Sequence, residues 1–137
     1  HNFLRSGSNE NIPSSTERLR VMYVVGKLAD LEASFRATAI ATKKDVYGIA
    51  AAQRAARLKH TLYEISQQVP NEYLSHAVDV ALAVPLKLGQ SEALVAAADE
   101  IGKAARKFAE EVDGNELSAI DAYLPSPEEY KLSQRNP

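Results

Sequence analysis

Hydrophobic positions recur at intervals of three and four residues along most of the chain, the spacing typical of amphipathic helices. The clearest repeat lies between Asp45 and Pro70. We expect Asp45 to cap its start, because a carboxylate accepts hydrogen bonds from the free N–H groups of a first turn. Pro70 is expected to end it, because proline lacks the N–H needed to continue. The apolar positions of this helix are Ala51, Ala55, Leu58, Leu62, Ile65 and Val69.

A first helix is predicted over residues 15–43. Ser14 and Glu17 have the spacing of a capping box, in which each side chain bonds to the other residue's backbone N–H. The short junction to the second helix predicts that the two pack antiparallel. One continuous helix is the alternative, but Tyr47 and Gly48 favour a break. The expected buried stripe is Leu28, Leu31, Phe35, Thr38 and Ala39, with Val21, Val24 and Val25 nearer the start.

A third helix is expected to start at Asn71, which has a side chain suited to capping. Pro85 lies inside its apolar pattern and is expected to kink or end the helix, because it removes one hydrogen bond and clashes with the preceding turn. Gly89 is a plausible stop. The apolar positions of this helix are Leu74, Ala77, Ala81, Val84 and Leu88.

A fourth helix is predicted from a cap at Ser91 to a stop at Asp113-Gly114. Its apolar positions are Leu94, Ala98, Ile101, Ala105, Phe108 and Val112.

These patterns predict three segments: a flexible N-terminal arm over 1–13, a four-helix bundle over 14–114, and a C-terminal loop and short helix over 115–137. Short connections predict an all-α, four-helix up-down-up-down bundle with a short extra C-terminal segment. That segment cannot fold alone, so we expect it to dock on the bundle or on a partner. It is expected to form a short helix through Leu117, Ile120, Ala122, Tyr123 and Leu124, closed by Pro125 and Pro127.

The composition of the chain narrows the classes of function that it can have. The 137 residues suit one domain, and a net charge of −2 argues against nucleic acid as the main partner. Cysteine is absent, which excludes disulfides and thiolate metal sites. No apolar run reaches the roughly 18–20 residues that a membrane span needs.

Catalytic motifs are missing as well. The chain has no phosphate-binding glycine loop, no GxSxG and no Glu-x-x-His pair of the kind that builds a di-iron bundle. His60 and Glu64 share a helix face and are interpreted as a surface pair, and His76 as a boundary residue. We therefore predict no enzyme activity, no metal and no cofactor.

Charge is distributed unevenly along the sequence. Seven acidic residues and no basic ones lie between Glu110 and Glu129. The stretch between residues 43 and 60 contains five Lys and Arg residues but a single acidic residue, Asp45. One interpretation is a set of ordinary solvated surfaces; the other is docking on an acidic partner. The predicted partner-binding residues, called the docking set below, are Lys43, Lys44, Arg54, Arg57 and Lys59.

The predicted second helix also has sequence features that resemble those of a known protein family. An aromatic residue near its start lies in Val46-Tyr47-Gly48-Ile49, a leucine–basic run extends from Leu58-Lys59-His60 to Ser66, and Val69-Pro70 follows. In these features, and in architecture over roughly 16–112, the chain resembles the PsbQ-type extrinsic proteins of photosystem II. It lacks the proline-rich N-terminal segment and the Trp-Pro of the plant proteins. With its extra C-terminal segment, it is more similar to the second, PsbQ-like extrinsic protein of diatoms.

The resemblance implies a non-catalytic subunit in the thylakoid lumen of a plastid, peripheral to the membrane. It implies docking of bundle lysines and arginines on the photosystem II core and other extrinsic subunits, which supports calcium and chloride retention by the oxygen-evolving complex. The competing class is a secreted, effector-like helical protein that binds a host protein. For that class, Asn2-Phe3-Leu4-Arg5 followed by Glu17-Arg18 resembles an oomycete leader without its first arginine. A bundle enzyme, the third class, lacks an assembled site.

Overall fold

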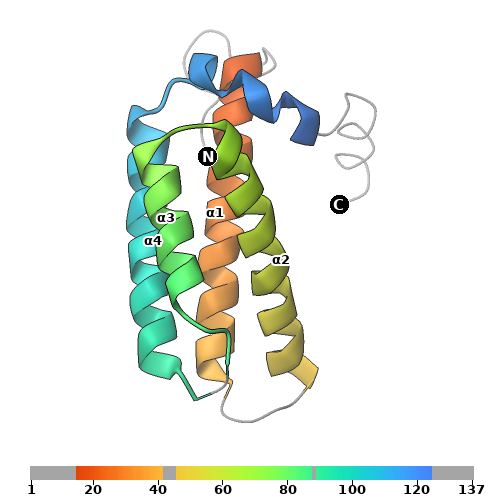
Figure 1. Cartoon of the computed structure of the whole chain (residues 1–137), viewed down its shortest axis with the longest axis vertical. Coiled ribbons are helices and arrows are strands. Elements are labelled where there is room, and N and C mark those ends of the chain that lie inside the picture. Colours follow the sequence, from red (N-terminus) through yellow and green to blue (C-terminus); the bar gives the residue numbers. More distant parts are fainter. Residues whose placement is uncertain (1–14, 42–45, 88, 125–137) are drawn as a thin grey trace, which may run out of the picture.

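The computed structural model describes residues 15–41, 46–87 and 89–124. Over these residues the chain forms five helices that pack together, without strands, which confirms the all-helical prediction. Successive long helices run in opposite directions, and η2 crosses one end of the group, as Figure 1 shows. The helices are α1 (Thr16–Ile40), α2 (Val46–Gln68), α3 (Glu72–Ala83), α4 (Ser91–Glu111) and the 3-10 helix η2 (Gly114–Tyr123).

The core forms where the predicted apolar stripes meet. Phe35 and Phe108 are the largest fully buried side chains. Most stripe positions are buried, so the periodicity identified the inward faces correctly; Val21, Val25, Ala51, Val84 and Val112 are only half-buried, and Leu88 lies outside the described residues. The buried stripe positions are Val24, Leu28, Leu31, Phe35, Thr38, Ala39, Ala55, Leu58, Leu62, Ile65, Val69, Leu74, Ala77, Ala81, Leu94, Ala98, Ile101, Ala105 and Phe108.

The helix starts were predicted less well. Ser15, not Ser14, caps α1, and its hydroxyl accepts from the Arg18 backbone N–H at 3.2 Å. Asn71 caps α3 as predicted, with its side-chain oxygen 2.9 Å from each of two backbone nitrogens. The Ser91 cap is wrong: Ser91 is already helical, and Gln90 precedes it without a side-chain cap bond. Asp45 lies outside the described residues.

The first helix ends earlier in the chain than the sequence predicted. The break after the first helix is confirmed, because α1 ends at Ile40 and Ala41 is extended. The chain leaves α3 after Ala83, two residues before Pro85, as expected where proline crowds the preceding turn. Gly89 does not stop this helix; with φ 90° it lies in the turn before α4.

The start of the predicted C-terminal segment docks on the helices, mainly on α1. Leu117 and Ile120 of η2 are fully buried, and Leu117 has non-helical dihedral angles that kink the element. Gly114 packs so closely on the backbone of Glu17 that a β-carbon there would overlap the Glu17 carbonyl. Arg20 of α1 adds a clamp described below. Pro125 and Pro127 lie outside the described residues.

Candidate functional site

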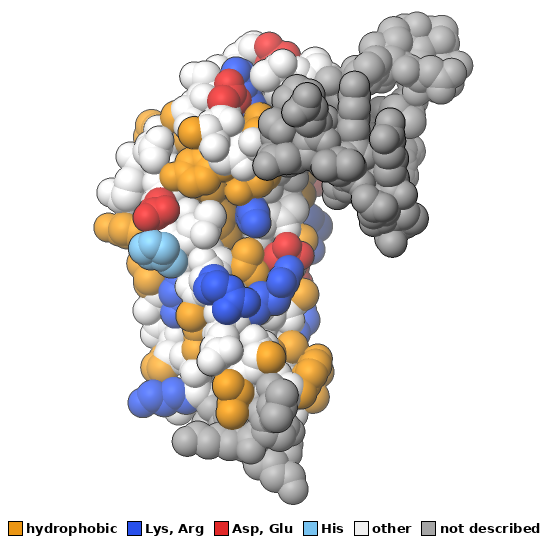
Figure 2. Space-filling view, turned by 90° about the vertical axis from the view of Figure 1, so that its right-hand side faces the viewer, with side chains coloured by type: hydrophobic (Ala, Val, Ile, Leu, Met, Phe, Trp, Pro, Cys, Tyr) orange, Lys and Arg blue, Asp and Glu red, His pale blue; other side chains and the backbone are white. Residues whose placement is uncertain are grey.

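The docking set was predicted as one surface, and the structure divides it. Arg54, Arg57 and Lys59 all lie on α2, while Lys43 and Lys44 lie outside the described residues. Lys and Arg side chains gather across the middle of this side of the molecule, between hydrophobic side chains (Figure 2). Residues two apart on a helix point about 200° away from each other, so Arg57 and Lys59 lie on different edges of α2.

Arg54 and Arg57 occupy one of these edges, because residues three apart share a helix face. The guanidinium of Arg54 reaches α1, where its Nη2 lies 3.3 Å from Oδ2 of Asp30. Both partners are about half exposed, so this ion pair contributes little to stability. Arg57 is exposed and makes no ion pair with any residue that the structure describes. This edge therefore carries one positive charge without an ion pair among the described residues and one that is loosely paired.

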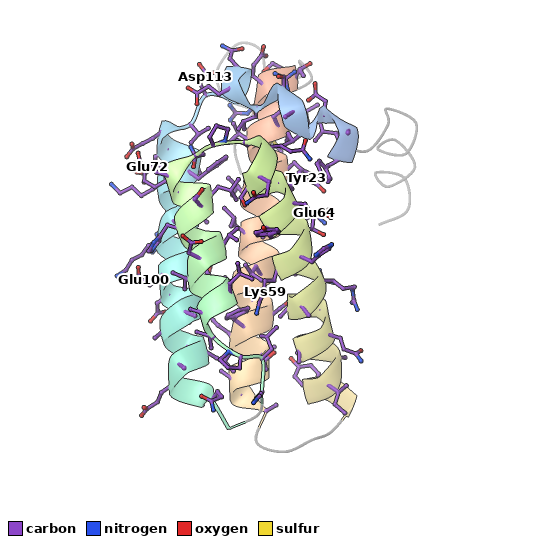
Figure 3. The ribbon with its side chains drawn as sticks, viewed as in Figure 1. Tyr23, Lys59, Glu64, Glu72, Glu100 and Asp113 are labelled. Atoms are coloured by element: carbon purple, nitrogen blue, oxygen red, sulfur yellow. The ribbon has the colours of Figure 1, made fainter. Side chains whose placement is uncertain are left out.

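Lys59 lies on the other edge, in the gap between α2 and α3 (Figure 3). Its Nζ lies 5.9 Å from the centroid of the Phe35 ring, which is fully buried in α1. The side chain is half-buried, and burial lowers the pKa of the Lys59 amine. Within the described ranges no carboxylate is close enough to form an ion pair with it. The amine therefore has the face of an aromatic ring as its main local stabilisation.

A groove of about 380 Å³ surrounds this amine. It forms because α3 ends early and leaves part of the longer α2 uncovered, an outcome that begins with Pro85. Two large apolar side chains are exposed along it, Tyr63 at 43% and Leu82 at 51%. We call this feature the α2–α3 groove; it is lined by Ala56, Lys59, His60, Tyr63 and Leu82.

His60 forms a surface pair with Glu64, as the sequence suggested, and His76 is also exposed. Nε2 of His60 lies 3.1 Å from Oε2 of Glu64, one turn along α2. Nε2 of His76 lies 3.3 Å from Oε1 of Glu100, a contact between α3 and α4 that the sequence did not reveal. Over the residues described, no cluster of His, Asp or Glu side chains is suited to hold a metal ion.

A second groove, of about 350 Å³, lies between α3 and α4 and is occupied by internal polar contacts. The Tyr73 hydroxyl donates to Oε1 of Glu111 at 2.7 Å, and this bond is the main reason why the pKa of Tyr73 rises to about 12. Nζ of Lys103 lies 3.4 Å from Oε2 of Glu100. Most charges in this groove are paired within the molecule, and of its lining carboxylates Glu72 alone forms no ion pair with a described residue.

One residue of the acidic C-terminal run, Asp121, forms an ion pair with a cation of the same chain. Arg20 of α1 donates from Nε and Nη2 to the two carboxylate oxygens of Asp121, at 2.7 and 2.8 Å, and from Nη1 to the Gly114 carbonyl. The Arg20 hydrogen bond is the main cause that lowers the pKa of Asp121. Sequence spacing gave no indication of this clamp, because its two members are 101 residues apart.

Another network joins α1 to α4. Nη2 of Arg36 lies 2.6 Å from Oε2 of Glu32 and 2.9 Å from Oδ1 of Asp99. The Glu32–Arg36 half has i, i+4 spacing and was recognisable in the sequence, whereas Asp99 required the fold.

Comparisons with known proteins add no relative: no family model, no curated protein and no solved structure matches the chain. None of the described helices is both long and apolar enough to cross a membrane.

Proposed function

We propose that this protein is a non-catalytic docking subunit that binds an acidic surface of a larger assembly through α2. The observation that carries the proposal is the state of the α2 cations. Arg57 and Lys59 have no ion-pair partner among the described residues, whereas two of the three cations of α4, Lys103 and Lys107, are paired with Glu100 and Glu111 and only Arg106 is unpaired. Unmatched cations attract an acidic partner at longer range, and several together set its orientation and on-rate.

The assembly we propose is photosystem II, with the protein on the lumenal side of the thylakoid membrane beside the oxygen-evolving complex. Support comes from the PsbQ-like features of the second helix and from the alternating directions of α1 to α4 (Figure 1). We propose that residues 14–114 form an up-down-up-down four-helix bundle of that kind, with η2 as the start of the extra C-terminal segment. In this role the protein supports retention of calcium and chloride and itself provides no catalytic group.

Rebinding to salt-washed photosystem II cores tests the proposal. The full chain is expected to cosediment with the cores at low ionic strength and to dissociate as salt rises, because salt screens exposed charges over about 8–10 Å. Oxygen evolution at low calcium and chloride is expected to increase when the protein rebinds. A parent protein that fails to bind cores even at low salt would contradict this assignment.

A further inference from the structure

The α2–α3 groove contains an amine without a counter-charge. A half-buried lysine loses part of its hydration free energy, and without an ion pair no carboxylate offsets that loss. Lys59 is in this position within the described part of the chain: its Nζ lies over the Phe35 ring and forms no ion pair there. The Lys59 ammonium group is therefore able to form an ion pair with an anionic group of another molecule.

The apolar walls of the groove indicate which chemical groups lie next to the anionic group of a bound molecule. Tyr63 and Leu82 expose large apolar surfaces on either side, and Ala56 leaves room between them. A volume of about 380 Å³ is near the lower end of known ligand sites, which run from about 300 to 1,000 Å³. The groove is open to solvent and is therefore shaped for side chains that enter from a neighbouring surface. Free inorganic anions would leave the apolar walls uncovered.

We propose that the α2–α3 groove receives a carboxylate side chain of a partner protein together with an adjacent large apolar side chain, with Lys59 as the anchor. This inference rests on the proposed docking function and adds the chemistry of the contact. Arg54 and Arg57, on the other edge of α2, contribute attraction at longer range. Lys59 contributes a short-range contact whose strength depends on exclusion of water by Tyr63 and Leu82.

A peptide titration tests the groove without any assumption about the assembly. The probe is acetyl-Leu-Glu-Leu-Tyr-amide, and its control is the same peptide with glutamine in place of glutamate. Added to the isotopically labelled full chain, the glutamate peptide is expected to shift the NMR signals of the Lys59 side chain and the Tyr63 ring. The glutamine peptide is expected to bind at least fivefold more weakly. Equal shifts with both peptides, or no shift in either residue, would overturn the inference.

Two matched variants separate the groove from general charge. Lys59→Met keeps an unbranched apolar side chain over Phe35 and removes only the amine, so the fold is expected to persist. Arg57→Gln removes one charge from the same helix on its other edge. We expect Lys59→Met to weaken binding of the glutamate peptide at least fivefold and Arg57→Gln to weaken it less than twofold. Equal losses would reject Lys59 as the anchor.

The same variants, assayed on photosystem II cores, distinguish the two proposals. If the parent binds cores and Lys59→Met binds as well as the parent, the docking function stands and the groove inference fails. If the parent does not bind cores while the glutamate peptide still engages Lys59, the groove inference stands and photosystem II is the wrong assembly. A larger loss for Lys59→Met than for Arg57→Gln supports both.

Discussion

Leu62 of α2 and Phe108 of α4 show how single residues support the core, since each is fully buried. Truncation to alanine removes transfer free energy and leaves a cavity, so Leu62→Ala is expected to lower the free energy of unfolding by about 2–5 kcal/mol and Phe108→Ala by about 3–5 kcal/mol. Chemical denaturation measures both. Tyr47→Ala is the control, because Tyr47 is 66% exposed and surface substitutions usually change stability by less than about 0.5 kcal/mol. Unchanged denaturation midpoints for both core variants would reject the assigned stripes.

Asp121 gives a residue-scale prediction about pH. Its pKa is lowered by the hydrogen bond from Arg20, so the folded state binds a proton less readily than the unfolded chain. The stabilisation from this pair is present above the unfolded carboxyl pKa of about 3.9 and is lost as pH falls through the folded value. We expect the melting temperature of Asp121→Asn to fall less than that of the parent between pH 5 and pH 2.

Glu116→Gln is the matched control for this experiment. Glu116 lies on the same element, η2, and is exposed without an ion pair among the described residues. Its variant is expected to follow the parent's pH profile. Parallel profiles for all three proteins would show that the Arg20–Asp121 clamp does not contribute to acid sensitivity.

At the scale of elements, the start of α3 depends on one side chain. Asn71 accepts from two backbone N–H groups that otherwise lack partners. Asn71→Ala is therefore expected to lower the free energy of unfolding by about 1 kcal/mol. Gln90→Ala, at the equivalent position before α4, removes no side-chain cap bond and is expected to have little effect. Equal losses at both positions would argue against the capping role.

Two glycines give opposite predictions about how the elements fit together. Gly114→Ala would force η2 away from α1, because the added β-carbon overlaps the Glu17 carbonyl. We expect a clear loss of melting temperature and faster hydrogen exchange in η2. Gly26 lies on α1 with open space around it, so Gly26→Ala is expected to stabilise the helix by up to about 1 kcal/mol. Thermal melts of the two variants that shift in the same direction would contradict this packing.

The element scale also shows how far sequence reasoning extends. Positions such as Leu58 and Ile101 were assigned correctly because burial follows directly from helical periodicity. The cap at Ser14 was wrong because the adjacent Ser15 suits a cap equally well, and the cap at Ser91 was wrong because the helix starts one residue earlier than a serine cap there would require. The α2–α3 groove was not foreseen. It needs the early end of α3 and the placement of Phe35 beneath Lys59, and both depend on how helices distant in sequence pack.

At the scale of the whole molecule, internal ion pairs hold the α1, α4 and η2 surfaces together. Arg36 joins α1 to α4, and Arg20 joins α1 to η2. Among the described residues of α2, only Arg54 forms an ion pair with another helix, through Asp30 of α1. On α2, Arg57 and Lys59 form no ion pair with a described residue, and Lys and Arg side chains gather on the side of the molecule that Figure 2 shows.

Charge reversal on α2, with a matched reversal on α4, tests the docking claim most directly. Arg54, Arg57 and Lys59 changed to Glu carry the same change in net charge as Lys103, Arg106 and Lys107 changed to Glu. Glutamate is nearly as good a helix former as arginine or lysine, so both triple variants are expected to stay helical. α4 lies on the opposite side of the molecule from α2 (Figure 1).

The measurement is rebinding of the parent and both triple variants to salt-washed photosystem II cores at low ionic strength, with helicity checked by circular dichroism. The α2 triple variant is expected to lose at least ten times more affinity than the α4 triple variant. If both lose affinity equally, net charge and not the α2 surface governs binding. If the α2 triple variant rebinds like the parent, the cations of α2 are an ordinary solvated surface and the account is contradicted.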